Sequence, residues 1–474
     1  MRAVRRTAGF LSVALVLVTC LGAQNAPRRG GPPQQQFQEA LSHYQSGQYA
    51  LAAGELEALA QKIPPSFQVD ELLGLVYSAE GKDEEANRVL QEAVRLNPAS
   101  AAARANLAVN LARLGKSSQA EAEFKQAVKA EPDNFEANHD FGEFYARAGR
   151  MGRAIPYLAR AQHLRPSSYE NGYDLALAYE QNGQLEEARR QIQELLRTGE
   201  TAELHDLLAE VDERSGDYLA SAKEYQQAAH LDPSEQNIFD WGSEYLLHHT
   251  WNPAVEIFSQ GVERYPNSVP FAVGLGLALY WRGDYDEAVK ALLRATDLAP
   301  SDPHTYYFLS NAYERAPGEA SEIIARFRRF EDLCPNDTRA AYYYAMSLWK
   351  FKGAENSDVV LPQVVSLLEK AARLDPSYAD VHLQLGKLYS EQREYSEAVP
   401  EYNRAVQLDP KLIEAHYLLG QAYVHLGKKE LAEKEFALHQ KLYARHLAED
   451  NQERERIRQF VYSIRGSQKD GRSQ

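Results

Sequence analysis

Two adjacent histidines, His248 and His249, are the side chains whose type best suits metal binding in this 474-residue chain. A protein metal site needs several His, Cys, Asp or Glu ligands at spacings that bring them to one point. The pair is expected to lie in a turn, and we identify no Cys or carboxylate near it at ligand spacing. The sequence therefore predicts no metal site and no bound cofactor.

Residues that could act as a nucleophile or hold a nucleotide are equally isolated. Cys334 precedes a proline and has no partner motif for redox or nucleophilic chemistry, so we predict a small buried side chain at a turn. Gly274 and Gly276 lack the preceding strand and the third glycine of a dinucleotide-binding loop. The H-E-x-x-H, C-x-x-C, G-x-S-x-G and P-loop motifs are absent, and we predict no catalytic residue.

The elements that would position any site are clearest in residues 379–412, ADVHLQLGKLYSEQREYSEAVPEYNRAVQLDPKL. Leu385 and Tyr389 lie four residues apart, as do Ala398 and Tyr402, so each pair shares one face of a helix. This spacing predicts two amphipathic helices in one short segment.

The residues between and after these pairs define how the two helices meet. A polar break at 391–394 separates them, and Pro410 cannot continue the second helix. Gly386 and Ala398 are small, which predicts that the helices approach most closely there and that a larger side chain would separate them. The segment therefore predicts an antiparallel helical hairpin.

This unit recurs along almost the whole chain, with Leu-Gly-x2-Tyr in the first helix, Ala in the second helix and Pro at the end of the unit. The pattern L-G-x2-Y, A-x3-F, then P within about 34 residues resembles the tetratricopeptide repeat. The resemblance extends over residues 33–446. Twelve units are expected to begin near Pro33, Phe67, Ala101, Phe135, Tyr169, Ala202, Glu235, Val269, Pro303, Thr338, Ala379 and Ile413.

The resemblance implies an all-α fold, a right-handed α-solenoid of about twelve helical hairpins with a C-terminal capping helix. The expected organisation is a signal peptide (1–23), a flexible linker (24–36), the repeat array (37–446), the capping helix (447–465) and a disordered tail (466–474). Residues 351–361 lengthen one unit, and we expect them to form a long loop between its two helices. That loop is either a partner contact or a tolerated surface insertion.

The first 23 residues have the features of a secretory signal peptide: three arginines, then a 12-residue apolar run from Phe10, then small residues before Gln24. Two alternatives stay open, namely an N-terminal membrane anchor and a lipoprotein in which Cys20 carries the lipid. Loss of the leader changes the formal net charge from −15 to −18. An acidic exported chain disfavours nucleic acid and anionic membranes as partners, and leaves membrane attachment only to a lipid on Cys20.

In tetratricopeptide arrays the first helix of each unit lines a concave groove that holds partner peptides, with repeat positions 2, 5, 6, 9 and 12 facing it. By this resemblance, the predicted groove is acidic in its N-terminal half and aromatic in its C-terminal half. The alternative is that the acids form an ordinary solvated face and that some aromatics pack between helices. The predicted groove residues are Glu136, Asp140, Glu143, Glu170, Asp174, Glu203, Asp206, Glu210, Tyr280, Tyr307, Tyr342 and Trp349.

These observations favour a non-enzymatic interaction scaffold that is exported to the periplasm or associated with the outer membrane. Its partner would be a protein or peptide that offers a basic segment, or an apolar or aromatic one. An alternative hypothesis is a receptor or regulatory subunit of an enzyme complex, for example one of glycosyl transfer or polysaccharide export, with catalysis on another chain. The repeats leave no room for a separate catalytic domain, so an enzyme is the least favoured reading.

Overall fold

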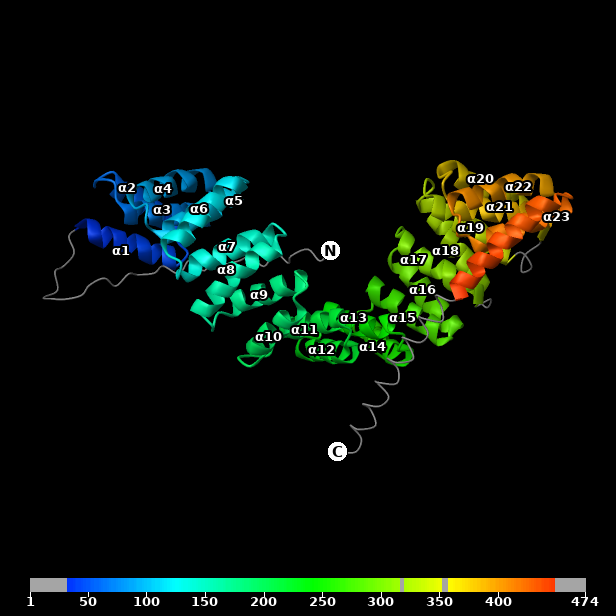
Figure 1. Ribbon diagram of the computed structural model, residues 1–474, viewed down its shortest axis with the longest axis horizontal. Helices are drawn as coiled ribbons and strands as arrows, with labels where there is room; N and C mark the ends of the chain where they lie inside the picture. Colours follow the sequence, from blue (N-terminus) through cyan, green and yellow to red (C-terminus); the bar gives the residue numbers. More distant parts are fainter. Residues whose placement is uncertain (1–31, 316–318, 352–356, 448–474) are drawn as a thin grey trace, which may run out of the picture. The chain divides into compact units, whose positions relative to one another are not determined.

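The computed structural model describes residues 32–315, 319–351 and 357–447, and every regular element within these ranges is a helix (Figure 1). The chain divides into two compact units, Met1–Glu200 and Thr201–Gln474. The predicted signal peptide, the predicted disordered tail and all but the first residue of the predicted capping helix lie outside the described residues. Among the described residues, no helix combines the length and the apolar character needed to cross a bilayer.

The N-terminal unit holds five helical hairpins. Its helices are α1 (Pro32–Gln45), α2 (Tyr49–Ala60), α3 (Phe67–Ala79), α4 (Asp83–Leu96), α5 (Ala101–Arg113), α6 (Ser117–Ala130), α7 (Phe135–Arg147), α8 (Met151–Leu164), α9 (Tyr169–Gln181) and α10 (Leu185–Leu196).

The C-terminal unit continues the pattern. Its helices are α11 (Ala202–Ser215), α12 (Tyr218–Leu231), α13 (Glu235–Leu247), α14 (Trp251–Arg264), α15 (Val269–Arg282), α16 (Tyr285–Leu298), α17 (Pro303–Ala312), the 3₁₀ turn η1 (Tyr313–Arg315), α18 (Ala320–Leu333), α19 (Thr338–Lys350), α20 (Ser357–Leu374), α21 (Ala379–Glu391), α22 (Tyr395–Leu408) and α23 (Ile413–His425). A further helix covers 429–447.

The all-α repeat fold predicted from the sequence is confirmed, and the first helix of each unit begins at or within one residue of its predicted start. Two local expectations were wrong. Residues 32–36 of the expected linker belong to α1. Proline is tolerated at the start of a helix because the N–H that it lacks would have no partner within the helix there. Residues 357–361 of the expected long loop are helical, because α20 begins at Ser357 and runs for 18 residues.

The two helices of a hairpin approach where a glycine of the first helix faces a large residue of the second. A Cβ added to Gly386 in α21 would lie 2.5 Å from Cε1 of Tyr402, whose side chain is fully buried. The same relation holds between Gly74 and Leu90, where the distance is also 2.5 Å. A side chain at either glycine would force its neighbour to shift, so the close spacing of the hairpin depends on glycine at this position.

First helices also pack against the first helices of neighbouring units. In the N-terminal unit, α1, α3, α5, α7 and α9 form such a series, and α13, α15, α17 and α19 form one in the C-terminal unit. One face of each unit is therefore made of first helices, and the predicted groove residues belong to first helices.

A polar tie that the sequence analysis did not anticipate joins several units to the turn before them. The fourth residue of the first helix contacts both a glutamate of the second helix and the proline carbonyl of the preceding turn. In α23, His416 Nδ1 lies 2.6 Å from Glu435 Oε2, and His416 Nε2 lies 3.2 Å from the carbonyl of Pro410. His382 and Arg104 occupy the same position and make the corresponding pairs of contacts.

The Gly386 contact yields the first testable prediction. Gly386→Ala should lower the free energy of unfolding by roughly 1–3 kcal/mol, because the fully buried Tyr402 ring would have to shift to admit the added Cβ. Urea denaturation followed by circular dichroism measures this loss. The matched control is Gly54→Ala in α2, where an added Cβ meets no atom within 4 Å. That substitution should leave stability unchanged or raise it by up to about 1 kcal/mol, and equal losses in both variants would contradict the packing argument.

Candidate functional site

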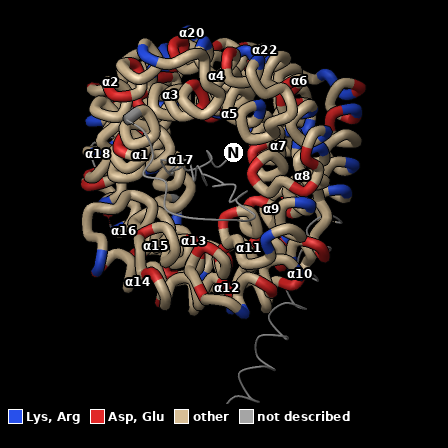
Figure 2. The backbone as a smooth tube through the Cα atoms, turned by 90° about the vertical axis from the view of Figure 1, so that its left-hand side faces the viewer, with Lys and Arg blue, Asp and Glu red and all other residues tan. Residues whose placement is uncertain are grey.

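Predicted groove acids of the N-terminal unit gather on α7 and α9, which carry acidic residues along their length (Figure 2). Asp140 of α7 and Asp174 of α9 are both half-buried. Burial raises the pKa of Asp140 to about 7 and that of Asp174 to about 6. In both cases Glu143 adds to the increase while His139 and Arg147 oppose it. Because the same three side chains act on both carboxyls, the two aspartates belong to one cluster.

The three other predicted acids on α7 and α9 are either paired with arginine or exposed to solvent. Glu136 pairs with Arg165 at 2.8 Å, and Glu143 pairs with Arg147 on its own helix. Glu170 is exposed. We call the five residues Glu136, Asp140, Glu143, Glu170 and Asp174 the acidic surface. Arginines accompany two of its glutamates, whereas no ion pair with Lys or Arg is found for Asp140 or Asp174 among the described residues.

The other three predicted acids lie on α11, in the C-terminal unit. Glu203 is exposed, and Asp206 and Glu210 are half-buried. Burial raises the pKa of Tyr225 on α12 well above its usual range, and the Asp206 and Glu210 carboxylates add to that increase. These acids therefore face the hydroxyl end of a core tyrosine.

The predicted aromatic residues do not form one exposed surface. Tyr280, Tyr342 and Trp349 are partly buried against a single hydrophobic core that extends from α16 to α21. Only Tyr307 is largely exposed, at 51%. Packing between helices, which the sequence analysis left open as an alternative, thus accounts for part of the aromatic content.

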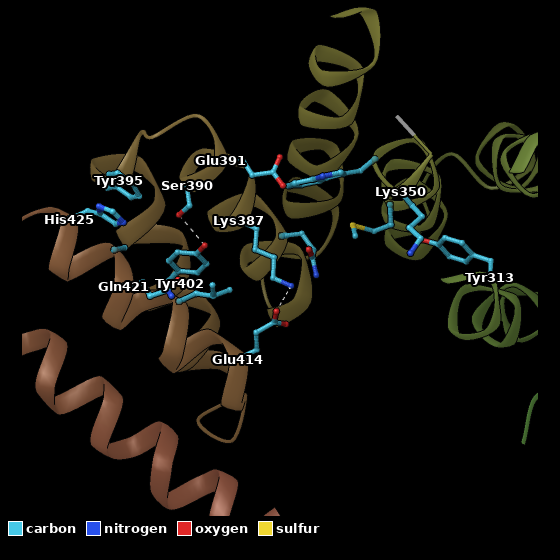
Figure 3. A pocket seen from close by; sticks show the side chains of 15 residues that line it. Tyr313, Lys350, Lys387, Ser390, Glu391, Tyr395, Tyr402, Glu414, Gln421 and His425 are labelled. Carbon is cyan, nitrogen blue, oxygen red and sulfur yellow. Dashed lines mark hydrogen bonds and ion pairs between the residues drawn. The ribbon is translucent and has the colours of Figure 1, made fainter. Parts of the chain in front are cut away.

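A cavity of about 570 Å³ opens among the first helices α19, α21 and α23. Figure 3 shows Lys387 reaching Glu414 across it, with their charged atoms 2.8 Å apart, and Ser390 beside the Tyr402 hydroxyl at 3.1 Å. Trp349, a predicted groove residue, also contributes to its wall. The cavity thus combines an aromatic wall with a polar rim that carries charges of both signs.

Six of the fifteen residues that line the cavity occupy groove positions of the last two units, for which no groove residues were predicted. Gln384, Lys387 and Ser390 are positions 6, 9 and 12 of the unit that begins at Ala379, and Glu414 is position 2 of the next. The signal for them was present in the sequence, because the same counting rule applied to the last two units would have selected them.

One expectation about His248 was wrong, because a carboxylate does lie at ligand spacing from it. Glu244 precedes His248 by one helical turn, and its Oε1 lies 3.5 Å from His248 Nε2. Burial raises the pKa of Glu244 to about 7 and lowers that of His248 to about 4. Glu213 of α11 completes a group whose potential ligand atoms lie within 4.8 Å of one another.

The raised pKa of Asp140 predicts a pH dependence of stability. The folded value, about 7, exceeds the usual value of an aspartate, so the protonated form is favoured by folding. Its contribution is therefore fully present below about pH 4 and is lost as pH rises through about 7. Asp140→Asn should remove this loss, so that the variant is more stable than the parent at pH 8 by on the order of 1–2 kcal/mol after allowance for solvent screening.

Unfolding midpoints measured from about pH 4.5 to about pH 8.5 test this expectation, because this range extends more than about one unit on either side of the folded pKa of about 7. The matched control is Glu194→Gln on α10, since Glu194 is exposed and pairs with Arg197. A difference between Asp140→Asn and the parent that stays constant across this range would show that Asp140 ionises normally.

Comparison with known proteins is consistent with this geometry. Models described as tetratricopeptide repeat match residues 37–101, 105–169 and 145–211, and one described as TPR repeat matches 276–316 and 389–427. Among curated proteins no match is found.

Three of the solved structures that are similar to this chain are described by their identity, coverage and TM-score. Naa15/Naa10 bound to HypK-THB shares 19% identity over 86% of this chain and 68% of that one, with a TM-score of 0.37. PilF of Pseudomonas aeruginosa shares 21% over 43% and 94%, with a TM-score of 0.35. Yeast Tom70 shares 13% over 85% and 98%, with a TM-score of 0.36.

The family assignment rests on the repeat models, which match segments in both compact units. The helical hairpins found in the structure have the same boundaries as the sequence repeats. The chain therefore belongs to the tetratricopeptide-repeat family and is a helical scaffold of the kind that supports protein–protein interaction.

Proposed function

We propose that the chain is a non-enzymatic scaffold of the cell envelope that binds an extended segment of a partner protein on its first-helix faces. The acidic surface of the N-terminal unit would take basic residues of that segment. The cavity among α19, α21 and α23 would take an apolar or aromatic side chain. Each surface lies within one compact unit, so binding at each surface can be tested separately.

The observation that carries the proposal is the half-buried pair Asp140 and Asp174. Two neighbouring carboxyls removed from water are costly to ionise, and their raised pKa values report that cost. A Lys or Arg supplied by a partner would stabilise the charged form of both. Binding would then be favoured because the partner's positive charge offsets the cost of ionising the two aspartates.

The cavity supports the second part of the proposal. Trp349 and Tyr313 provide aromatic walls, and aromatic side chains bury large areas with little loss of conformational entropy. Lys387 and Glu414 are already paired at 2.8 Å on the rim. We therefore propose that this end selects an apolar side chain, with the charged rim fixing the direction of the segment.

A labelled peptide whose first half alternates Lys with Ser and whose second half alternates Phe with Ser tests both surfaces. In fluorescence anisotropy, the variant with Asp140→Asn and Asp174→Asn should bind it at least about tenfold more weakly, a loss of about 1.4 kcal/mol. Raising the salt concentration should weaken binding to the parent more than to this variant. Trp349→Ala should weaken binding without changing the salt dependence.

Glu194→Gln serves as the control, because it removes an exposed acid on a second helix. Its affinity should equal that of the parent. Equal affinity for a peptide in which Glu replaces every Lys would refute the acidic surface as a binding site, as would an unchanged affinity in the aspartate variant.

The envelope location rests on the sequence of residues 1–23, with its arginines, apolar run and small residues before Gln24. When the full chain is produced in a Gram-negative bacterium, we expect a periplasmic or outer-membrane fraction in which the first peptide begins at Gln24. A lipid mass on a peptide that begins at Cys20 would instead identify a lipoprotein. Leu15→Arg, which interrupts the apolar run, should block export, and a parent chain that retains Met1 would contradict the proposal.

A further inference from the structure

Two consecutive first helices of the C-terminal unit bring three potential metal ligands together. Glu213 lies in the last turn of α11, Glu244 lies in the last turn of α13, and His248 follows α13 directly. Glu244 and His248 are four residues apart, so they project from the same side of the helix end. One ligand atom from each residue lies within 4.8 Å of the other two.

The separation of two of these ligand atoms is close to that in a coordination shell. Four-coordinate Zn²⁺ with bonds of about 2.0–2.1 Å places its ligand atoms roughly 3.3–3.4 Å apart. The 3.5 Å between His248 Nε2 and Glu244 Oε1 is near that value. Glu213 is half-buried and can therefore adjust its side chain to complete the shell.

Glu244 places an unsatisfied, buried carboxylate oxygen in this group. Its side chain is 1% exposed, and Oε1 has no hydrogen-bond partner among the residues that the structure describes. A buried carboxylate oxygen without a donor is costly, and native structures normally satisfy such an atom. A cation between Glu244, Glu213 and His248 would satisfy it.

The histidine ring is held in place for this role. His248 stacks on Tyr218 of α12, with ring centroids 3.8 Å apart and ring planes 29° from parallel. The stacking limits rotation of the imidazole while Nε2 lies toward Glu244. A ligand that is fixed before binding loses less conformational freedom when the ion arrives.

We propose that Glu213, Glu244 and His248 bind a divalent transition-metal ion, with Zn²⁺ as the best match to one imidazole and two carboxylates. Imidazole nitrogen suits Zn²⁺ better than Mg²⁺ or Ca²⁺, which prefer shells of oxygen alone. Water would complete the coordination. The ion would connect α11 to α13 and thereby tie two successive repeats together.

Titration of chelator-treated full-length protein with Zn²⁺ tests the proposal. Saturating Zn²⁺ should raise the unfolding midpoint by roughly 5–10 °C, because an ion that binds only the folded state stabilises it. Glu244→Gln and His248→Gln should each abolish this shift. Isothermal titration calorimetry should show one saturable site in the parent and none in either variant.

His382→Gln is the matched control, since it removes another histidine that lies 2.7 Å from a glutamate, Glu401, outside this group. Its response to Zn²⁺ should equal that of the parent. Should a ligand variant fail to fold, Co²⁺ added to the parent gives a second readout, a visible absorption band that Zn²⁺ displaces. No saturable Zn²⁺ binding by the parent, or an equal shift in both ligand variants, would overturn the proposal.

Discussion

The close approach of two helices within each hairpin is the contact on which the rest of the structure depends. At Gly386 and Tyr402 a missing side chain on one helix admits a full aromatic ring from the other. A solenoid has no central core, so every unit must bury its apolar face against itself and its neighbours. A change in hairpin spacing would therefore alter the stacking of the units on either side, and with it the surfaces formed by their first helices.

Polar ties add direction to this apolar packing. His416 connects Glu435 of its own hairpin with the Pro410 carbonyl of the turn before it. The proline of that turn therefore has a second role, because its carbonyl oxygen is a hydrogen-bond partner of a side chain in the following unit. The glutamate and the carbonyl together fix where the new helix starts relative to the old one. A typical intramolecular hydrogen bond contributes on the order of 1 kcal/mol of net stability.

The same repeat position serves different purposes in different units. Position 12 of a first helix is Trp349 in the cavity wall, Glu213 in the proposed metal group and Ser390 beside a core tyrosine. None of these three side chains is fully buried, so packing does not restrict the position to one residue type. Any recognition that the protein performs must therefore arise from differences between units rather than from the residues that they share.

The sequence by itself determined the repeat, its twelve starting points and the small residues at the hairpin contact, because these depend on local periodicity and side-chain size. It could not determine which groove acids are neutralised, since Arg165 reaches Glu136 across 29 residues of sequence. Nor could it show that Tyr342 is packed against the core, or that Glu213 of one repeat meets His248 of the next. Those outcomes depend on how separate helices are placed side by side, and only the tertiary structure decided them.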